Sequence, residues 1–225
     1  MLIERPPLLY RLLFPGAVWR IPSKNKCVYL TFDDGPIPEV TPWVLSVLEK
    51  YDIKATFFCV GENVIKHPDV YDAVLAAGHK TGNHTYNHLQ GLRTLTSRFI
   101  ANTIKASQVI DSRLFRPPHG HIRLPQFWQL KRSYQIVMWD LVTRDYSKKR
   151  NGEQVLETVQ KYARNGSIIV FHDSLKSQKN LQYALPKAIE WLLAEGYEFR
   201  LLPTIGEYRS AAQRAVAEER RQRAV

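Results

Sequence analysis

Cysteine is scarce in this sequence of 225 residues: only Cys27 and Cys59 occur, each inside an apolar run. Two cysteines cannot form the framework of a disulfide-rich scaffold, so that class of fold is excluded. We interpret both thiols as small buried hydrophobic groups, with a single bridge between neighbouring strands as the alternative. Glycine (11 residues) and proline (13 residues) stay near their average usage, which also excludes collagen-like and low-complexity chains.

Long hydrophobic runs are absent as well. The most apolar N-terminal stretch, Pro6–Trp19, is interrupted by Arg11 and Pro15 and has no small-residue cleavage site. We therefore predict neither a signal peptide nor a membrane span. The expected location is the cytoplasm, with the inner face of the membrane as the alternative.

Acidic side chains are the minority, because 21 Asp and Glu stand against 32 Lys and Arg, a formal net charge of +11. Within residues 121–150, seven basic side chains accompany two acidic ones, a local charge of +5. This balance predicts an anionic partner, either an acidic glycan or an anionic membrane surface. Nucleic acid is not expected as a partner, since the sequence has no recognisable nucleic-acid module or aromatic stacking motif. Nothing in it indicates an oligomeric state.

Apolar clusters rich in β-branched and aromatic residues recur along the chain, and we interpret them as buried strands. They are Cys27–Phe32, Ala55–Val60, His79–Asn83, Leu114–Arg116, Gln135–Asp140, Ser167–His172 and Tyr197–Leu202. Helical patterns lie between them. The clearest helix has Thr41 as its N-cap and Pro42 at its first helical position, and Ser97–Arg113 is predicted to be another long helix.

Strands and helices alternate without a linker or an internal repeat, which indicates an α/β fold with mostly parallel strands. No Gly-x-Gly-x-x-Gly follows the first strand, so a dinucleotide-binding fold is disfavoured. We predict a distorted (β/α) barrel of about seven parallel strands over residues 26–206. The segment 1–25 is expected to pack on this barrel, and the basic segment 207–225 to form a solvated helix or tail.

Polar and titratable side chains collect at the carboxyl ends of the predicted strands. In a parallel barrel these ends form one rim, where catalytic groups lie. Each side chain alone fits an ordinary loop position, but their joint placement predicts an active site at this rim. The residues are Asp33, Asp34, His84, His88, Arg116, Asp140, Asp145, His172 and Asp173.

Asp34, His84 and His88 have the composition of a catalytic metal site, because two histidines and one carboxylate leave coordination positions open for water and substrate. Histidines four residues apart share one face of a helical turn, so both imidazoles could reach one ion. Asp33 is then the candidate base that removes a proton from water. A histidine pair at this spacing can also be incidental, and the Asp33–Pro36 segment could be a turn with an N-cap.

His172 ends a strand that is apolar throughout. Taken alone, it fits a core histidine that donates to a backbone carbonyl. Beside a metal ion it would instead protonate a leaving group, because the ordinary pKa of histidine lies near neutrality. The remaining histidines show no comparable spacing and are expected to support the structure; they are His67, His79, His119 and His121.

Five segments resemble, in the same order, the motifs of the polysaccharide deacetylases, the NodB-homology group also known as carbohydrate esterase family four. The resemblance covers about residues 26–202 and implies a distorted (β/α) barrel that removes acetyl groups from N-acetylated sugars with the help of a metal ion. The segments are Thr31–Pro36 (TFDDGP), His84–His88 (HTYNH), Arg116–Gly120 (RPPHG), Trp139–Asp145 (WDLVTRD) and Val170–His172 (VFH).

The resemblance also implies a role for each matching side chain. Asp33 is similar to the catalytic base, and Arg116 to the arginine that holds this base. His172 is similar to the general acid, and Asp145 to the carboxylate that tunes it. The Asp34, His84 and His88 triad would hold one divalent metal ion; zinc is the favoured ion, with cobalt, nickel and manganese as alternatives.

This chain departs from the family at four positions near the expected substrate. His119 stands where Tyr or Phe is usual, Val142 replaces an aspartate, Tyr146 replaces a tryptophan and Val170 replaces a leucine. His119 would contribute its backbone N–H to the oxyanion. Tyr146 and Val170 would line a slot for the acetyl methyl group. These departures bear on the identity of the substrate more than on catalysis.

Two other functions remain open on the sequence alone. The first is a related metal amidohydrolase that acts on another acyl group, such as formyl on a lipid-linked amino sugar. The second is a catalytically inactive protein that binds an anionic surface through its positive charge.

Overall fold

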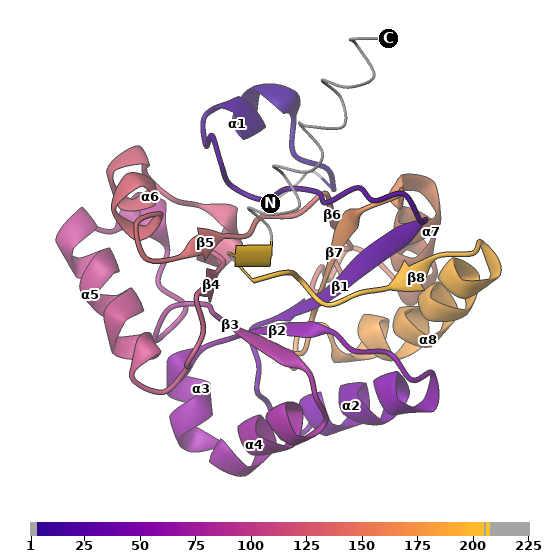
Figure 1. Cartoon of the computed structure of the whole chain (residues 1–225). Coiled ribbons are helices and arrows are strands. Elements are labelled where there is room, and N and C mark those ends of the chain that lie inside the picture. Colours follow the sequence, from indigo (N-terminus) through magenta and orange to yellow (C-terminus); the bar gives the residue numbers. More distant parts are fainter. Residues whose placement is uncertain (1–3, 205, 208–225) are drawn as a thin grey trace, which may run out of the picture.

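A computed structural model describes residues 4–204, 206 and 207 of the chain, in which parallel strands lie inside a ring of helices (Figure 1). The strands are β1 (Cys27–Asp33), β2 (Thr56–Cys59), β3 (Lys80–Asn83), β4 (Leu114–Phe115), β5 (Gln135–Ile136), β6 (Leu141–Val142), β7 (Ser167–His172) and β8 (Glu198–Phe199). The helices are α1 (Leu8–Leu12), α2 (Thr41–Lys50), α3 (Gly61–Lys66), α4 (Pro68–Ala76), α5 (Thr96–Ser107), α6 (Leu124–Leu130), α7 (Gly152–Tyr162) and α8 (Gln178–Ala194), with the 3-10 turns η1 (Gly91–Arg93) and η2 (Pro118–Gly120).

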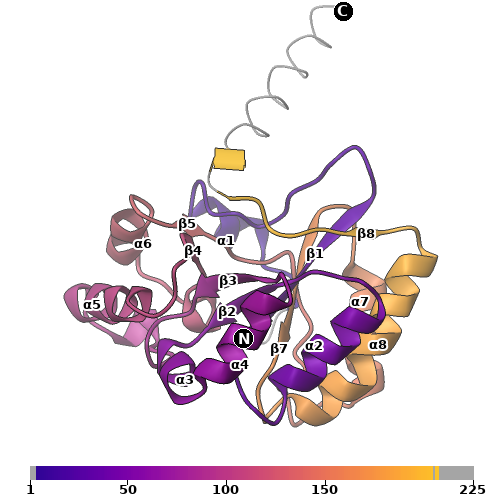
Figure 2. The same ribbon diagram turned by 60° about the horizontal axis from the view of Figure 1, so that its bottom comes forward.

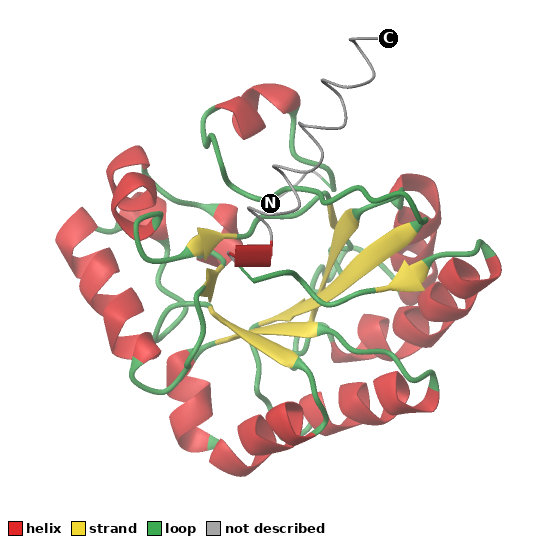
Figure 3. Cartoon of the chain, viewed as in Figure 1, coloured by secondary structure: helices red, strands yellow, loops and turns green. Residues whose placement is uncertain are grey.

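Seven strands form a curled parallel sheet in the order β5-β4-β3-β2-β1-β7-β6, which confirms the predicted distorted barrel. Strand β8 pairs with the first residues of β1. Within residues 4–204, β5 and β6 are the two ends of this order, so the barrel is open between them. The N-terminal segment lies along the opening, where Val18 bridges to Val137 and Arg20 to Ser167. Figure 3 shows the strands in yellow at the centre and the helices in red around them.

Both faces of β1 are buried, which explains its unbroken apolar run. Leu30 and Phe32 pack in an outer core between the sheet and the helices. Cys27 and Tyr29 point the other way, into an inner core that also contains Phe14 and Val18 of the N-terminal segment. Figure 2 shows α2 and α8 side by side on the flank where the outer core lies. Cys27 and Cys59 are both buried free thiols, as predicted.

The strand predicted at Gln135–Asp140 is wrong in extent, because two short strands, β5 and β6, flank a break at residues 137–140. At this break the buried Arg116 guanidinium donates to the carbonyls of Val137 (3.3 Å) and Met138 (3.0 Å). These acceptors serve a side chain instead of a neighbouring strand. The last predicted strand, Tyr197–Leu202, is likewise reduced to β8.

Two predicted helices differ in detail from the observed ones. Helix α2 begins at Thr41 with Val40 as its N-cap, because the Thr41 hydroxyl donates to Asp173 (2.6 Å) and accepts the Ile37 N–H (2.8 Å) instead of capping the helix. Helix α5 ends at Ser107, six residues before the predicted end at Arg113.

Among the described residues, no helix combines the length and the apolar content that a membrane crossing requires. The predicted basic tail, 207–225, lies outside the described residues except for Glu207. The predicted boundary between the segments 1–25 and 26–206 stays a prediction, although the first of these contributes Phe14 and Val18 to the inner core.

Candidate active site

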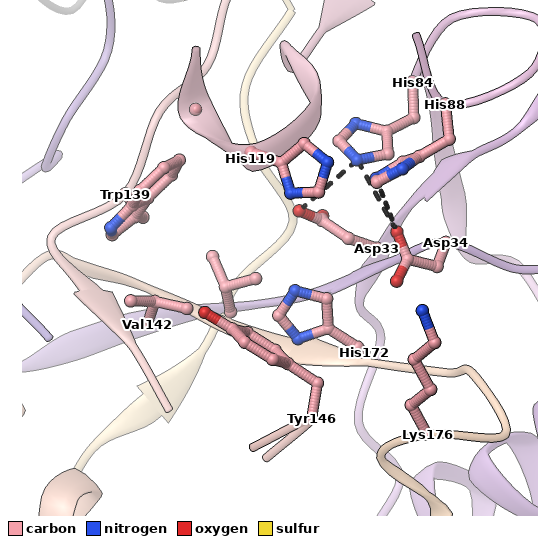
Figure 4. Close-up of a pocket in the computed structure, with 12 residues that line it drawn as sticks. Asp33, Asp34, His84, His88, His119, Trp139, Val142, Tyr146, His172 and Lys176 are labelled. Atoms are coloured by element: carbon pink, nitrogen blue, oxygen red, sulfur yellow. Dashed lines mark ion pairs between the residues drawn. The ribbon is translucent and has the colours of Figure 1, made fainter. Parts of the chain in front are cut away.

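The rim at the carboxyl ends of the strands carries a cavity of about 160 Å³. The parallel register of the strands places titratable side chains next to one another at this rim, because Asp33 at the end of β1 pairs with His172 at the end of β7. Figure 4 shows carboxylates, imidazoles and two aromatic rings converging on this cavity from several loops. The lining residues are Asp33, Asp34, His84, His88, His119, Gly120, Trp139, Val142, Tyr146, Val170, His172 and Lys176.

Asp34, His84 and His88 form a compact cluster. The Asp34 Oδ1 atom lies 3.1 Å from His88 Nε2 and 3.8 Å from His84 Nε2, and the three candidate ligand atoms all lie within 4.8 Å of one another. Among the described residues this Oδ1 atom is buried and has no hydrogen-bond partner of acceptable geometry. A buried carboxylate oxygen without a donor normally requires a cation. The donor set therefore fits a divalent metal ion.

The protonation state of the cluster also fits ligation. His84 Nδ1 lies 2.7 Å from the Arg116 carbonyl, which can only accept, so Nδ1 carries the hydrogen and Nε2 presents its lone pair to Asp34. Burial lowers the pKa of His84 to about 4. Burial by itself would raise the pKa of Asp34, but His88, His172 and His84 hold it well below its usual range. At neutral pH, His84 is therefore a neutral imidazole and Asp34 an ionised carboxylate, the states in which both side chains bind a metal ion.

The two histidines do not share a helical turn, and this expectation is wrong. Thr85 (φ 66°) and His88 (φ 56°) are left-handed, which prevents a helix between them. The Thr85 N–H is taken by the Asn83 side chain (2.8 Å) and the Leu89 N–H by the Thr85 hydroxyl (3.0 Å). A loop stabilised by side chains therefore brings the two imidazoles to the same point.

Asp33 is held by the buried Arg116. Its Oδ1 atom accepts from the Arg116 guanidinium at 2.6 Å, while Oδ2 lies 4.0 Å from His84 Nε2. Arg116 itself is fully buried, donates to the Thr31 hydroxyl at 2.9 Å and stacks over the Phe58 ring. A fully buried cation with these fixed partners keeps one oxygen of Asp33 occupied and leaves the other facing the cavity.

His172 is paired with the fully buried Asp145. The His172 Nδ1 atom lies 2.7 Å from one oxygen of this carboxylate, and the His172 backbone N–H donates to the other. Burial by itself would lower the pKa of His172, but the Asp145 carboxylate raises it to about 9. The Tyr146 ring meets the imidazole edge-on, with ring centres 4.8 Å apart. His172 therefore carries a proton at neutral pH and has a fixed orientation.

Asp173 fixes the turn that follows Asp33 and Asp34. Its carboxylate accepts the Gly35 N–H (3.0 Å) and the Thr41 hydroxyl (2.6 Å). Burial raises the pKa of Asp173 to about 8, and the Asp34 charge adds to this effect. A Cβ atom at Gly35 would lie 2.0 Å from the Asp173 carboxylate, so only glycine fits after Asp34. The sequence placed Asp173 at the rim but did not reveal this role.

The rest of the cavity wall contains predicted and unpredicted residues. His119, Tyr146 and Val170 line the cavity, as the resemblance implies. His119 is left-handed (φ 58°), packs edge-on against His88 and has its pKa lowered to about 4, chiefly by burial.

Sequence reasoning assigned no site role to Gly120, Trp139 or Lys176, which also line the cavity. A Cβ atom at Gly120 would lie 2.0 Å from the Trp139 ring, so the two positions are matched. The available signals were the glycine of the third motif, the tryptophan that opens the fourth, and a lysine four residues after His172.

Asp140 does not belong to the rim, which corrects the expectation from its place after a predicted strand. Its carboxylate binds Arg164 (2.6 Å), Arg11 (3.0 Å) and the Ser167 hydroxyl (2.8 Å). Ser167 begins β7, whereas His172 ends it, so this cluster lies at the opposite end of the barrel.

Comparison with known proteins places the same motifs in a family context. A sequence family described as Polysaccharide deacetylase matches residues 20–139. Over 201 residues the chain is 33% identical to the peptidoglycan-N-acetylglucosamine deacetylase of Bacillus cereus, which covers 86% of this chain and 94% of the relative. It is 36% identical over 159 residues to the chitooligosaccharide deacetylase of Rhizobium leguminosarum bv. trifolii, with coverage of 67% and 73%.

Solved structures show the same fold. A peptidoglycan N-acetylglucosamine deacetylase in complex with 4-naphthalen-1-yl-N-oxidanyl-benzamide superposes with a TM-score of 0.80 and 29% identity, covering 88% of this chain and 95% of the other. A CE4 family pseudoenzyme from Bacillus anthracis superposes with a TM-score of 0.71 and 25% identity, covering 82% and 66%. Likeness of fold therefore extends to a relative described as a pseudoenzyme.

Proposed function

Because the chain belongs to the polysaccharide deacetylase family, we propose that it removes the N-acetyl group from an N-acetylated amino sugar of a polysaccharide or peptidoglycan fragment. The observation that carries this proposal is the meeting of a ligand triad, a held carboxylate and a protonated histidine around one cavity. Each of the three elements supplies a different requirement of amide hydrolysis.

The triad Asp34, His84 and His88 would hold one divalent metal ion, for which zinc is favoured and cobalt, nickel and manganese are alternatives. When bound there, such an ion polarises the amide carbonyl and lowers the pKa of a water. The support is the donor set itself and the buried Asp34 oxygen that lacks a hydrogen-bond donor among the described residues.

Asp33 would act as the general base. Its Oδ2 atom is the one that Arg116 leaves open, and it faces the cavity close to His84. This oxygen takes a proton from the water that attacks the amide carbon, so that the new carbon–oxygen bond forms without a free hydroxide ion. Arg116 acts as a positioning residue, because it holds Asp33 but does not itself line the cavity.

His172 would act as the general acid. The carbon–nitrogen bond breaks as the imidazolium gives its proton to the sugar nitrogen, and the products are acetate and a free amine. The Asp145 pairing supports this role, since it keeps His172 protonated at neutral pH. It occupies Nδ1 and leaves Nε2 as the ring nitrogen that can donate to the substrate. The proton that His172 loses is balanced by the one that Asp33 has gained.

The wall of the cavity would select the acyl group and the sugar. Tyr146 and Val170 are placed to contact the acetyl methyl group, and the backbone N–H of His119 is proposed to help hold the carbonyl oxygen as negative charge develops. Lys176 also lines the cavity and favours a substrate that carries a carboxylate close to the acetamido group.

The direct test is acetate release from N-acetylglucosamine oligomers and peptidoglycan fragments, with and without added zinc. The wild-type chain should release acetate, and Asp33→Asn should reduce the rate by about 10²-fold or more while leaving metal content unchanged. His67→Ala, outside the cavity, serves as the control and should match the wild type. Loss of metal in Asp33→Asn would make Asp33 a ligand and exchange the roles of the two aspartates.

A formamido sugar is the second candidate substrate, because four wall positions depart from the family pattern. Parallel assays on formylated and acetylated amino sugars distinguish the two enzymes. If the chain is instead an inactive protein that binds an anionic surface, the third alternative, it should release neither acetate nor formate from any of these sugars even with a full equivalent of metal bound. The cytoplasmic location also stays a proposal; fractionation of cells expressing the chain tests it.

A further inference from the structure

Helix α1 and Leu13, the residue that caps its C-terminus, expose four leucines although the segment packs on the body of the protein. Tyr10 of α1 and Phe14, two residues after the helix, pack against the inner core, whereas the leucine side chains face outward. Their exposed fractions are 72% for Leu8, 75% for Leu9, 66% for Leu12 and 51% for Leu13. A contiguous exposed apolar surface of this kind marks a contact site.

The apolar surface continues across a groove to the next element. The groove encloses about 670 Å³ and lies between the Pro6–Phe14 segment and the loop that enters α6. On the far side, Leu124 and Trp128 of α6 expose 46% and 50% of their surfaces. We call Leu8, Leu9, Leu12 and Leu13 together with Leu124 and Trp128 the α1–α6 surface; in Figure 1, α1 lies at the top of the view and α6 at its upper left.

The charges around the α1–α6 surface have one sign. Residues 5–32 contain no acidic residue, and residues 84–139 contain one, Asp111. Asp111 lines a separate hollow with His79 and Thr204, away from the groove. The exposed cations on the elements that border the groove are Arg93, Arg123 and Arg132, and the half-buried Lys131 lies over the Trp128 ring.

This surface adjoins the candidate active site. The Tyr10 hydroxyl donates to the Gly120 carbonyl at 2.6 Å, and Gly120 lines the active-site cavity. Arg123 donates to the Leu92 carbonyl and Lys131 to the Pro15 carbonyl (2.7 Å), so both walls of the groove are held by side-chain contacts. A binding partner that contacts α1 and α6 would therefore lie beside the rim that carries the catalytic groups.

We propose that the α1–α6 surface docks on a lipid bilayer that contains anionic headgroups. Leucines and a tryptophan enter the boundary between headgroups and acyl chains, while the bordering arginines and lysine attract lipid phosphates. A symmetric pair of copies would bring the same cations against one another, which disfavours self-association through this face. The proposal does not depend on deacetylase activity.

Vesicle flotation tests the proposal with the full chain. The wild type should float with vesicles of phosphatidylglycerol and phosphatidylcholine, should bind phosphatidylcholine vesicles weakly, and should be released as salt is raised. The double substitution Leu9→Glu/Leu12→Glu should reduce the bound fraction about 10-fold or more, since it places two charges at the apolar boundary.

The matched control is Ile65→Glu/Leu75→Glu, which makes the same charge change on α3 and α4, at positions 54% and 44% exposed. Figure 1 shows α4 on the side of the barrel opposite α1. The control should bind vesicles like the wild type, and circular dichroism should show both variants folded. Equal losses in both double variants would overturn the proposal, as would absence of wild-type binding to anionic vesicles. A wild-type dimer that Leu9→Glu/Leu12→Glu dissociates would assign the surface to a second copy instead.

Discussion

The Asp145 carboxylate holds His172 by two contacts, one to the ring Nδ1 atom at 2.7 Å and one to the backbone N–H at 2.8 Å. The second contact fixes the strand end, and the first fixes the ring, so the imidazole cannot rotate without losing a buried charged partner. The same carboxylate opposes the effect of burial and raises the pKa of His172 to about 9. The protonation state and the orientation of this histidine therefore have one cause.

Asp145→Asn should remove the charge but keep the shape, and the pKa of His172 should fall toward the low values that burial favours. The alkaline limb of the pH–rate profile, expected near pH 9 in the wild type, should move to lower pH, so that the loss of rate is larger at pH 8 than at pH 6. Asp111→Asn, far from the cavity, is the control. An unchanged alkaline limb would show that another group is the acid.

The same pair makes a prediction for stability. A histidine whose pKa is raised on folding stabilises the folded state fully below its unfolded pKa, about 6.5, and this contribution disappears as the pH rises through about 9. The difference in unfolding free energy between wild type and Asp145→Asn should therefore be largest near pH 6 and should shrink by pH 9. Urea unfolding at several pH values measures it.

His84→Ala and His88→Ala should each abolish tight binding of one divalent ion per chain, because two remaining protein ligands hold such an ion too weakly. His172→Ala should keep the ion, since His172 is bound to Asp145 rather than to the Asp34 cluster. Metal analysis after dialysis measures the stoichiometry. Retention of a full equivalent in both ligand variants would refute the site.

The cluster of Asp140 should matter for stability and leave the chemistry intact. Asp140→Asn leaves Arg164 and Arg11 without their buried partner and should lower the unfolding free energy by about 3 kcal/mol, while activity at permissive temperature is unchanged. Glu198→Gln, which breaks an exposed pair with Arg200, is the matched control and should change stability far less, because solvent screens this pair. Equal effects would mean that the cluster is not a stabilising feature.

The sequence was sufficient to predict residues whose position follows from a strand end. Asp33, Asp34 and His172 follow directly from buried strands, and their parallel register places them at one rim. The two histidines of the triad were predicted correctly as neighbours but for the wrong reason, because the expected helical turn is a loop with left-handed residues. Spacing alone does not distinguish these two ways of bringing imidazoles together.

What the sequence could not predict depends on contacts between distant segments. The break between β5 and β6 occurs where Arg116 donates to the carbonyls of Val137 and Met138. Arg116 lies 21 residues before Val137, so the local sequence pattern could not predict this contact. Asp140 was predicted to lie at the rim because its contacts with distant segments could not be predicted from the sequence either. Its actual partners, Arg11 and Arg164, come from the N-terminal segment and from the loop before β7.

Lys176 supplies a prediction about substrate choice. It lines the active-site cavity on the loop after β7, and among residues 4–204 no hydrogen bond or ion pair engages its ammonium group. Figure 4 shows its side chain reaching toward the gap between Asp34 and His172. A cation in this place should attract a sugar carboxylate, such as that of N-acetylmuramic acid, more than it attracts a neutral N-acetylglucosamine unit.

Lys176→Ala should therefore raise KM for a carboxylate-bearing acetylated sugar by about 10-fold, while kcat stays close to the wild-type value, because one partly solvated charge pair contributes on the order of 1 kcal/mol to binding. KM for neutral N-acetylglucosamine oligomers should hardly change, and the salt dependence of KM for the acidic substrate should weaken. Lys176→Arg keeps the charge and should retain the preference, and Lys179→Ala, on α8 and outside the cavity lining, is the matched surface control. Steady-state kinetics on the two substrates at low and high salt make the comparison. Equal changes in KM for both substrates would show that Lys176 contributes to the shape of the cavity but does not discriminate between charged and neutral sugars.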